Sequence, residues 1–281
     1  MQRQKSFDGN KACLYLVATP IGNLEELTPR AIEVLKSVDV IAAEDTRNTV
    51  RLLSHFEIKT KLIAHHEFNE QQSSQGILEL LNQGKSVALV SDAGYPCISD
   101  PGALLVKTVS EQGYAVVPIS GANAGLAALV ASGITPQPYM FYGFLDAKES
   151  KRKEQLEELE SVPCTMIFYE APHRISKTLQ SMHEVLGNRS ICLARELTKL
   201  HEEFIRGTLS EVIEVADALK GEMVIVVEGK KKEEKAITMS MVEAKVNEYI
   251  KSGMSASEAI KCTAKELKIS KNEVYRHYHQ A

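Results

Sequence analysis

Short polar segments interrupt apolar runs along this sequence, and they carry most of the groups that could do chemistry. In the clearest case the apolar run 87–90 is followed by a loop, 91–102, rich in serine, aspartate, glycine and proline. Asp92 stands at the end of that run, Gly94 would let a ligand approach the backbone, and Pro96 limits the loop's freedom. The pattern is typical of a ligand-binding loop, although the same residues also suit a well-capped connection between a strand and a helix.

Six other segments share this character, each polar and each directly after an apolar run. They are 19–23, 44–47, 66–69, 120–124, 170–174 and 195–199. The strands of a parallel sheet point one way, so the loops at their carboxyl ends gather at one edge. Any one of these loops is more often structural than functional, but their recurrence predicts a shared cleft.

Several common kinds of site lack their sequence signals. There is no phosphate-binding Gly-x-x-x-x-Gly-Lys motif, no Gly-x-Gly-x-x-Gly after the first strand, and no Gly-x-Ser-x-Gly nucleophile turn. His65, His66 and Glu67 are adjacent, but neighbouring residues of one strand point to opposite faces, which disfavours a metal site. These observations argue against nucleotide hydrolysis, dinucleotide binding, acyl transfer and metal chemistry.

The elements that would position these loops alternate between strand and helix. Thr28 and Pro29 form a helix start before 30–37, and further helices are expected at 75–82 and beyond residue 103. The strands expected in the first 120 residues are 13–18, 38–43, 62–64, 87–90 and 115–119. Short connections between alternating elements predict an α/β layer with a mostly parallel sheet.

The composition changes after residue 138. An aromatic-rich stretch, 139–145, precedes a charged stretch, 146–160. Apolar runs follow, and they predict a second sheet with strands at 165–169, 190–194 and 223–227, for which a mixed arrangement is open. Past a charged linker, Ser255 and Ser270 begin two of three short helices, which resemble a helix-turn-helix unit or a helical brace.

These observations divide the chain into five parts. We expect a disordered or extended N-terminus (1–11), an N-terminal α/β domain (12–120), a C-terminal α/β domain (121–231), a linker (232–239) and a helix-turn-helix-like unit (240–281).

The bulk properties indicate an ordinary cytoplasmic protein. Its 281 residues are 44% hydrophobic and 25% charged, without an apolar run near the roughly 20 residues of a membrane helix or an evident signal peptide. The five cysteines are scattered, as expected for structural thiols in a reducing compartment. A net charge of −4 gives no general attraction for nucleic acid, so a polyanionic partner would need local basic patches.

Four motifs in this order resemble the tetrapyrrole methylase superfamily. They are Val-Ala-Thr-Pro-Ile-Gly-Asn-Leu at 17–24, Ala-Glu-Asp-Thr-Arg at 43–47, the loop 91–102, and Ser-Gly-Ala-Asn-Ala at 120–124. Within the superfamily they are most similar to the branch that methylates small-subunit ribosomal RNA. The same branch also fits Phe-Tyr-Glu-Ala-Pro-His-Arg at 168–174, the segment 195–199, the pair Gly221-Glu222 and the C-terminal helices.

The resemblance implies two α/β domains with S-adenosylmethionine in the cleft between them, in a homodimer. It implies 2′-O-methylation of a cytidine ribose in the decoding region of 16S rRNA, in the small ribosomal subunit. By motif position the cofactor-binding residues are Pro20, Asp92, Gly94, Pro96, Ile98, Ser99, Ser120, Gly121, Ala122, Tyr169 and Glu170. Gly121 is expected to face the cofactor closely.

The methyl group of this cofactor is activated by its sulfonium, so the chemistry requires no metal. A ribose hydroxyl needs a base to remove its proton, which contributes about 10²–10⁴-fold to the rate. The candidate bases are Glu44, Asp45, Glu196 and Glu203, and the cations that could hold phosphates are Arg47, Arg195 and Lys199. Ion pairs between the domains would account for the same residues equally well, and the sequence does not choose the base.

Two other functions compete with RNA methylation. The same fold could methylate a tetrapyrrole carbon, although the segment 44–47 and the C-terminal helices have little use in a small-molecule enzyme. Alternatively, the protein could be a non-catalytic ribosome assembly factor that keeps the cofactor as a fold ligand. The full set of polar loops favours an enzyme over such a factor.

Overall fold

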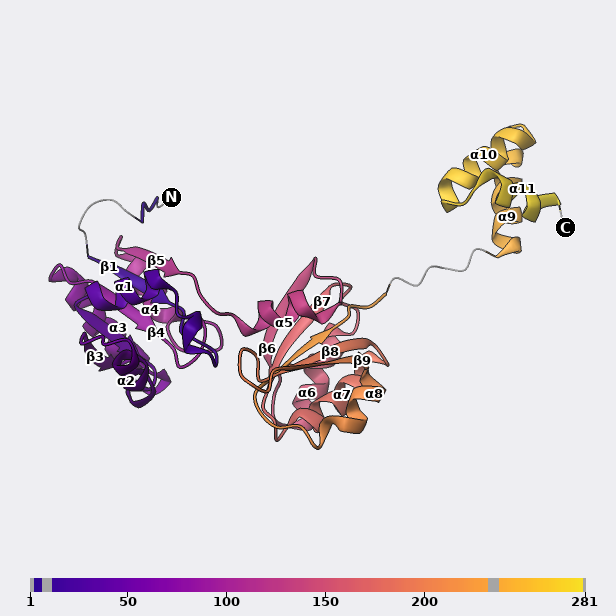
Figure 1. Ribbon diagram of the computed structural model, residues 1–281. Helices are drawn as coiled ribbons and strands as arrows, with labels where there is room; N and C mark the ends of the chain where they lie inside the picture. Colours follow the sequence, from indigo (N-terminus) through magenta and orange to yellow (C-terminus); the bar gives the residue numbers. More distant parts are fainter. Residues whose placement is uncertain (1–2, 7–11, 232–237, 280–281) are drawn as a thin grey trace. The chain divides into compact units, whose positions relative to one another are not determined.

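The computed structural model describes residues 3–6, 12–231 and 238–279, and the chain divides into two compact units, Met1–Lys230 and Lys231–Ala281. The first unit contains two five-stranded sheets, and the second contains three helices (Figure 1). The prediction of two α/β domains followed by a helical unit is therefore confirmed. No helix within the described ranges is both long and apolar enough to cross a membrane.

The first sheet is wholly parallel. Its strands are β1 (Cys13–Val17), β2 (Val40–Ala43), β3 (Lys61–Ala64), β4 (Val87–Val90) and β5 (Ala115–Ile119), in the order β3-β2-β4-β1-β5. Each predicted strand is present, with small shifts at the ends. All the carboxyl ends consequently lie at one edge, as the spacing of the polar loops predicts.

Helices cover both faces of this sheet. The helices are α1 (Pro29–Ser37), α2 (Thr46–His55), α3 (Glu70–Asn82) and α4 (Ala103–Glu111), with short 3₁₀ turns at Leu24–Glu26 and Glu67–Asn69. Leu35 and Leu53 of α1 and α2 pack into one cluster, while Ile77 and Leu105 of α3 and α4 pack into the other. The apolar strands are thus buried on both sides, which is why they read as continuous runs.

The segment 44–47 was expected to be a polar loop after a strand, but its last two residues, Thr46 and Arg47, belong to the first turn of helix α2. The side chain of Asp45 accepts a hydrogen bond from the Arg47 backbone N–H at 2.8 Å and so caps the helix. A carboxylate at this position satisfies one of the free N–H groups of the first turn. At α1 the predicted cap is confirmed, since the Thr28 hydroxyl accepts from the Ala31 N–H at 3.2 Å.

The second sheet is mixed, an arrangement that the sequence leaves open. Its strands are β6 (Tyr139–Phe144), β7 (Thr165–Glu170), β8 (Ser190–Arg195), β9 (Glu203–Thr208) and β10 (Met223–Val227), in the order β6-β7-β10-β8-β9. Only β6 and β7 are parallel, and β10 runs antiparallel to both of its neighbours. The amino end of β10 therefore lies at the same edge as the carboxyl ends of β7 and β8.

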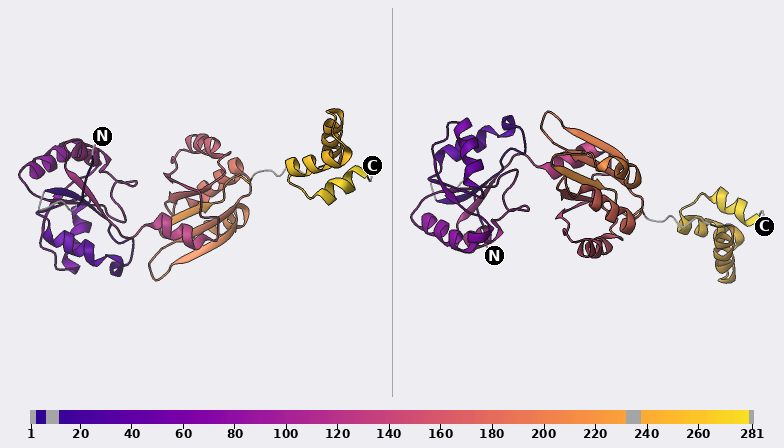
Figure 2. Two further views of the ribbon diagram at one scale, coloured as in Figure 1. Left: turned by 90° about the horizontal axis from the view of Figure 1, so that it is seen from above. Right: turned by 90° about the horizontal axis from the view of Figure 1, so that it is seen from below.

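One helix covers the first face of this sheet and three cover the other (Figures 1 and 2). Helix α5 (Ala124–Ser132) packs on β8 and β10, whereas α6 (Glu149–Leu159), α7 (Ile175–Leu186) and α8 (Leu209–Ala216) pack on the opposite side. Because α5 belongs to the second sheet, we retain the domain division at 120/121 as a proposal.

The C-terminal unit is built on its own small core. Helices α9 (Met239–Lys251), α10 (Ala256–Leu267) and α11 (Lys271–His279) bury Val242, Val246, Ile260 and Val274 against one another. Both predicted caps are present, because Ser255 and Ser270 accept hydrogen bonds from Glu258 N and Glu273 N. The expected N-terminal segment 1–11 lies outside the described residues except for 3–6, and of the expected linker 232–239 only Thr238 and Met239 are described.

Candidate active site

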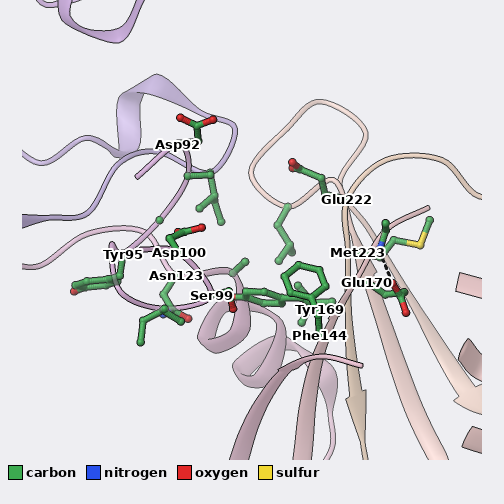
Figure 3. Close-up of a pocket in the computed structure, with 18 of the residues that line it drawn as sticks. Asp92, Tyr95, Ser99, Asp100, Asn123, Phe144, Tyr169, Glu170, Glu222 and Met223 are labelled. Carbon is green, nitrogen blue, oxygen red and sulfur yellow. Dashed lines mark hydrogen bonds between the residues drawn. The ribbon is translucent and has the colours of Figure 1, made fainter. Parts of the chain in front are cut away.

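A cavity of about 380 Å³ lies at the edge where β4 ends, within the range of ligand-binding pockets. One wall is the loop after β4, and the other comes from the edge of the second sheet (Figure 3). Seven of the candidate residues line it: Glu44, Asp92, Gly94, Ile98, Ser99, Tyr169 and Glu170. The polar loops of both sheets are thus brought together, as the sequence predicts.

The loop after β4 is held in a strained conformation. Cys97 and Ser99 adopt φ values of 71° and 65°, a left-handed region that costs non-glycine residues of the order of 1–3 kcal/mol each. Gly94, at φ 80°, forms a backbone bridge with Thr19, with N···O distances of 2.9 and 3.1 Å. The loops after β1 and β4 are therefore fixed to each other, and strain is retained where a ligand would bind.

Three carboxylates gather on this side of the cavity, Glu44, Asp92 and Asp100. Burial, together with the charge of Asp92, raises the pKa of Glu44 above its ordinary value. Burial and the charges of Glu44 and Asp92 raise the pKa of Asp100 to about 6, against a weaker opposing hydrogen bond from Ser91. Within the described part of the chain, no lysine, arginine or histidine nitrogen lies within 4 Å of these three groups.

This cluster of three carboxylates fits a positively charged ligand. S-adenosylmethionine carries a sulfonium and an ammonium, and either would relieve the repulsion among the three carboxylates. The same carboxylates are not arranged as metal ligands, since no group of three histidine, cysteine, aspartate or glutamate residues in the described ranges could hold an ion.

Aromatic rings form the opposite wall. The Tyr169 and Phe144 rings lie near one another in Figure 3, with centroids 5.7 Å apart. The Tyr169 hydroxyl accepts a hydrogen bond from the Gly125 backbone N–H at 3.2 Å, in the first turn of α5. Tyr169 thereby joins β7 to α5, and it lines the cavity with an aromatic ring, a group on which a planar base can stack.

Glu170 is less suited to ligand binding than its motif predicts. Its side chain is fully buried and accepts hydrogen bonds from Thr178 Oγ1 at 2.5 Å and Ala171 N at 2.8 Å. The Arg174 guanidinium lies 3.1 Å from the same carboxylate. The negative charge of Glu170 is therefore satisfied by groups of the second domain, although the residue lines the cavity.

The remaining cofactor candidates lie outside this cavity: Pro20, Pro96, Ser120, Gly121 and Ala122. Gly121 has a packing role, because a Cβ there would lie 2.9 Å from the Cβ of Ala18. Its N–H also donates to the Tyr95 hydroxyl at 3.3 Å. A larger residue at Gly121 would therefore disturb the backbone, whatever its effect on a ligand.

Most of the charged catalytic candidates are engaged in ion pairs. Asp45 pairs with Arg47 at 2.6 Å, and the hydrogen bonds from Arg47 lower the pKa of Asp45 to about 2. Arg195 pairs with Glu203 across β8 and β9. Of the charged catalytic candidates, only Glu44 lines the cavity.

Lys199 and Glu196 occupy a second strained loop. The Lys199 ammonium lies 3.0 Å from carboxylate oxygens of both Glu196 and Glu222, and Glu196 and Thr198 adopt φ values of 51° and 69°. The side chain of Lys199 crosses the backbone of Gly22, where a Cβ would lie 2.6 Å from the lysine Cγ. These residues fix the loop after β8 against the loop after β1.

Sequence reasoning missed several residues that line the cavity: Tyr95, Asp100, Asn123, Phe144, Glu222 and Met223. Tyr95, Asp100 and Asn123 belong to segments that the motifs single out, and Phe144 ends the aromatic-rich stretch. Glu222 belongs to the pair Gly221-Glu222, which fits the same family branch, whereas Met223 could have been found only from the antiparallel direction of β10.

Fold and site together define a methylase. The family of tetrapyrrole (corrin/porphyrin) methylases matches residues 13–213, and the chain belongs to this family. Within it, the chain is 52% identical to ribosomal RNA small subunit methyltransferase I of Bacillus subtilis, over 99% of both chains. It is 46% identical to the protein of that name from Halalkalibacterium halodurans, over the whole of each. The resemblance to this branch is thereby confirmed.

Solved structures share the fold of the first unit. Diphthine synthase matches with a TM-score of 0.62 and 11% identity, covering 77% of this chain and 90% of its own. Uroporphyrin-III C-methyltransferase from Thermus thermophilus, complexed with S-adenyl homocysteine, matches with a TM-score of 0.55 and 18% identity, covering 77% and 97%. At these identities the likeness concerns the fold alone.

Proposed function

We propose that the protein transfers a methyl group from S-adenosylmethionine to small-subunit ribosomal RNA. The observation that carries this proposal is the match, over 99% of both chains, to a relative named ribosomal RNA small subunit methyltransferase I. The finer assignment follows the motifs: the acceptor is the 2′-hydroxyl of a cytidine ribose in the decoding region of 16S rRNA. We further propose that the enzyme is a cytoplasmic homodimer and acts on the small ribosomal subunit.

The main cavity would hold the cofactor. S-adenosylmethionine, when bound, supplies a methyl group that is already activated by its sulfonium. The carboxylates of Asp92 and Asp100 would attract its positive charges, while the backbone of the loop 91–102 and the ring of Tyr169 would position it. Gly94, Ile98 and Ser99 keep their proposed role, whereas Pro20, Pro96, Ser120, Gly121 and Ala122 would act by shaping the adjoining loops.

Glu44 is the residue that we assign as the base. It is the one proposed catalytic carboxylate that borders the cavity, and burial raises its pKa, which strengthens it as a proton acceptor. Asp45, Glu196 and Glu203 instead hold Arg47, Lys199 and Arg195 in ion pairs. In this proposal those pairs position the loops that surround the acceptor.

Mass analysis of ribosomal RNA from a deletion strain tests the proposal. The deletion should remove one methyl group from a cytidine ribose of 16S rRNA, and the wild-type gene should restore it whereas Glu44→Gln should not. Purified protein incubated with labelled cofactor should modify small subunits and leave a precorrin unlabelled. Label in the precorrin would support the tetrapyrrole reaction, and an unchanged rRNA with no label in either would support the assembly-factor alternative.

A further inference from the structure

A second cavity, of about 250 Å³, adjoins the one assigned to the cofactor. It lies between the loop after β1 and the first turns of α2, and Asp92 lines both cavities. A ligand in the second cavity would therefore meet a ligand in the first at the Asp92 carboxylate. No role proposed above uses this space.

The size of the second cavity indicates one unit of a larger ligand. Pockets for drug-sized molecules start at about 300 Å³, and this cavity is smaller. A tetrapyrrole macrocycle would not fit, whereas a single nucleotide extruded from an RNA chain would. Pro20, Leu24 and Leu52 supply apolar surface, and Leu24 is 40% exposed.

Two of the polar groups in its wall are already engaged. The Thr19 hydroxyl donates to the Ser91 carbonyl at 3.1 Å, and the Thr49 hydroxyl donates to the Asp45 carbonyl at 3.0 Å. Asn48 differs, because its amide nitrogen donates to Asp92 Oδ2 at 2.8 Å and its side chain makes no other hydrogen bond within the described ranges. An amide oxygen and a second N–H thus remain for the edge of a base.

Arg51 supplies positive charge at the same place. It lies one helical turn after Arg47 on α2, and it is exposed. Arg47 is held by Asp45, whereas Arg51 forms no ion pair with any residue in the described part of the chain. An exposed guanidinium beside a nucleotide-sized cavity is suited to a backbone phosphate.

We propose that this second cavity is the acceptor-nucleotide site, with Asn48 contacting the target base and Arg51 an adjoining phosphate. The inference rests on the proposed function and names the part of the enzyme that selects its substrate. In the transfer that this site would serve, the acceptor oxygen would form its new bond to the methyl carbon of bound S-adenosylmethionine while the carbon–sulfur bond would break, leaving its electron pair on sulfur. The proton of the hydroxyl passes to Glu44, beside the shared wall.

Arg51→Ala and Asn48→Ala test the assignment, with Lys36→Ala as the matched control. Lys36 is an exposed cation in the last turn of α1, beside the amino end of β2 and so at the opposite edge of the sheet. Arg51→Ala should raise KM for small subunits about 5- to 20-fold with little change in kcat. It should also reduce the slope of log KM against log salt by about 0.7–0.9, as loss of one phosphate contact requires.

Asn48→Ala should raise KM and lower kcat, because it removes both the contact to the base and the bond that orients Asp92. Arg51→Lys should recover much of the loss, and calorimetry should give all variants wild-type affinity for S-adenosylmethionine, with Asn48→Ala within about threefold. Anisotropy of a short cytidine-containing RNA, with S-adenosylhomocysteine present, should show the same order of affinities without turnover.

Wild-type KM and salt slope in both alanine variants would overturn the acceptor site while leaving the proposed function intact. A KM rise of the same size in Lys36→Ala would also overturn it, because the effect would then be general electrostatics. A wild-type enzyme that methylates no ribosomal RNA would overturn the proposed function itself, and the acceptor assignment with it.

Discussion

Replacing Asp100 by asparagine should stabilise the protein in the absence of ligand at neutral pH. Burial, then the charge of Glu44 and that of Asp92, raise the pKa of Asp100 from its usual 3.8 to about 6. The unfolded chain has the ordinary value, so near pH 7.5 the ionised carboxylate is less favourable in the folded state than in the unfolded state. Asparagine keeps a similar shape and removes that charge.

The magnitude follows from the shift. About two pKa units correspond to roughly 3 kcal/mol, but solvent reaches part of the side chain and screens it, which reduces the expected gain to about 1 kcal/mol. For a unit of this size that gain is a rise in Tm of about 2–4 °C. An acid with a raised folded-state pKa contributes stability below the unfolded pKa and loses it as pH rises through the folded value. The advantage of Asp100→Asn should therefore be absent near pH 4 and complete above pH 7.

Thermal unfolding at pH 4.5, 6 and 7.5 provides the assay, and Asp217→Asn provides the control. Asp217 is exposed at the end of α8, and its replacement should leave Tm unchanged at each pH. The same Asp100→Asn variant should bind S-adenosylmethionine more weakly at pH 7.5, because one of the two carboxylates proposed to attract its positive charges is gone. An unchanged or lower Tm at pH 7.5, or a gain of equal size at pH 4.5, would refute the electrostatic reasoning.

Three further predictions concern Glu44, Glu170 and the C-terminal unit. Glu44→Gln should keep cofactor affinity within a fewfold and lose about 10²–10⁴ in single-turnover rate, whereas a normal rate would place the base elsewhere. Glu170→Ala should lower the free energy of unfolding by about 3–5 kcal/mol, because it removes a fully buried carboxylate that pairs with the partly buried Arg174. An unchanged free energy of unfolding in chemical denaturation would show that Glu170 has no such structural role. Deleting residues 238–281 should leave calorimetric cofactor binding unchanged but weaken subunit binding and flatten its salt dependence; unchanged binding and salt response would make the C-terminal unit a brace or a site for another partner.

The sequence predicts the first sheet well because its strands are buried on both faces. A short continuous apolar run such as 87–90, followed directly by a polar loop, is typical of a strand in a covered parallel sheet. Helices α10 and α11 of the C-terminal unit are predicted equally well, because the capping residues Ser255 and Ser270 mark where they begin. Helix α2 was harder to recognise, because its first turn consists of the same polar residues that indicate a functional loop.

Roles within the site were less predictable than its location. A carboxylate at the end of a strand looks the same in sequence whether it lines an open cavity, as that of Asp92 does, or pairs with an arginine inside the domain, as that of Glu170 does. A glycine in a polar loop likewise looks the same whether or not another segment packs closely on it, and a Cβ on Gly121 would lie 2.9 Å from the Cβ of Ala18. Such distinctions depend on packing between segments far apart in the chain.

The sequence analysis expects site residues in the loops at the carboxyl ends of strands, and the second sheet shows why this expectation misses part of the site. That rule finds Tyr169 because β7 points toward the cavity, but β10 is antiparallel and delivers Glu222 and Met223 from its amino end. Met223 pairs in register with both Glu170 and Arg195, so the ends of three strands meet at one level. Glu222 then holds Lys199, which crosses Gly22 of the first sheet's loop. A mixed sheet thus adds residues from both strand directions to a site that a parallel sheet supplies from one.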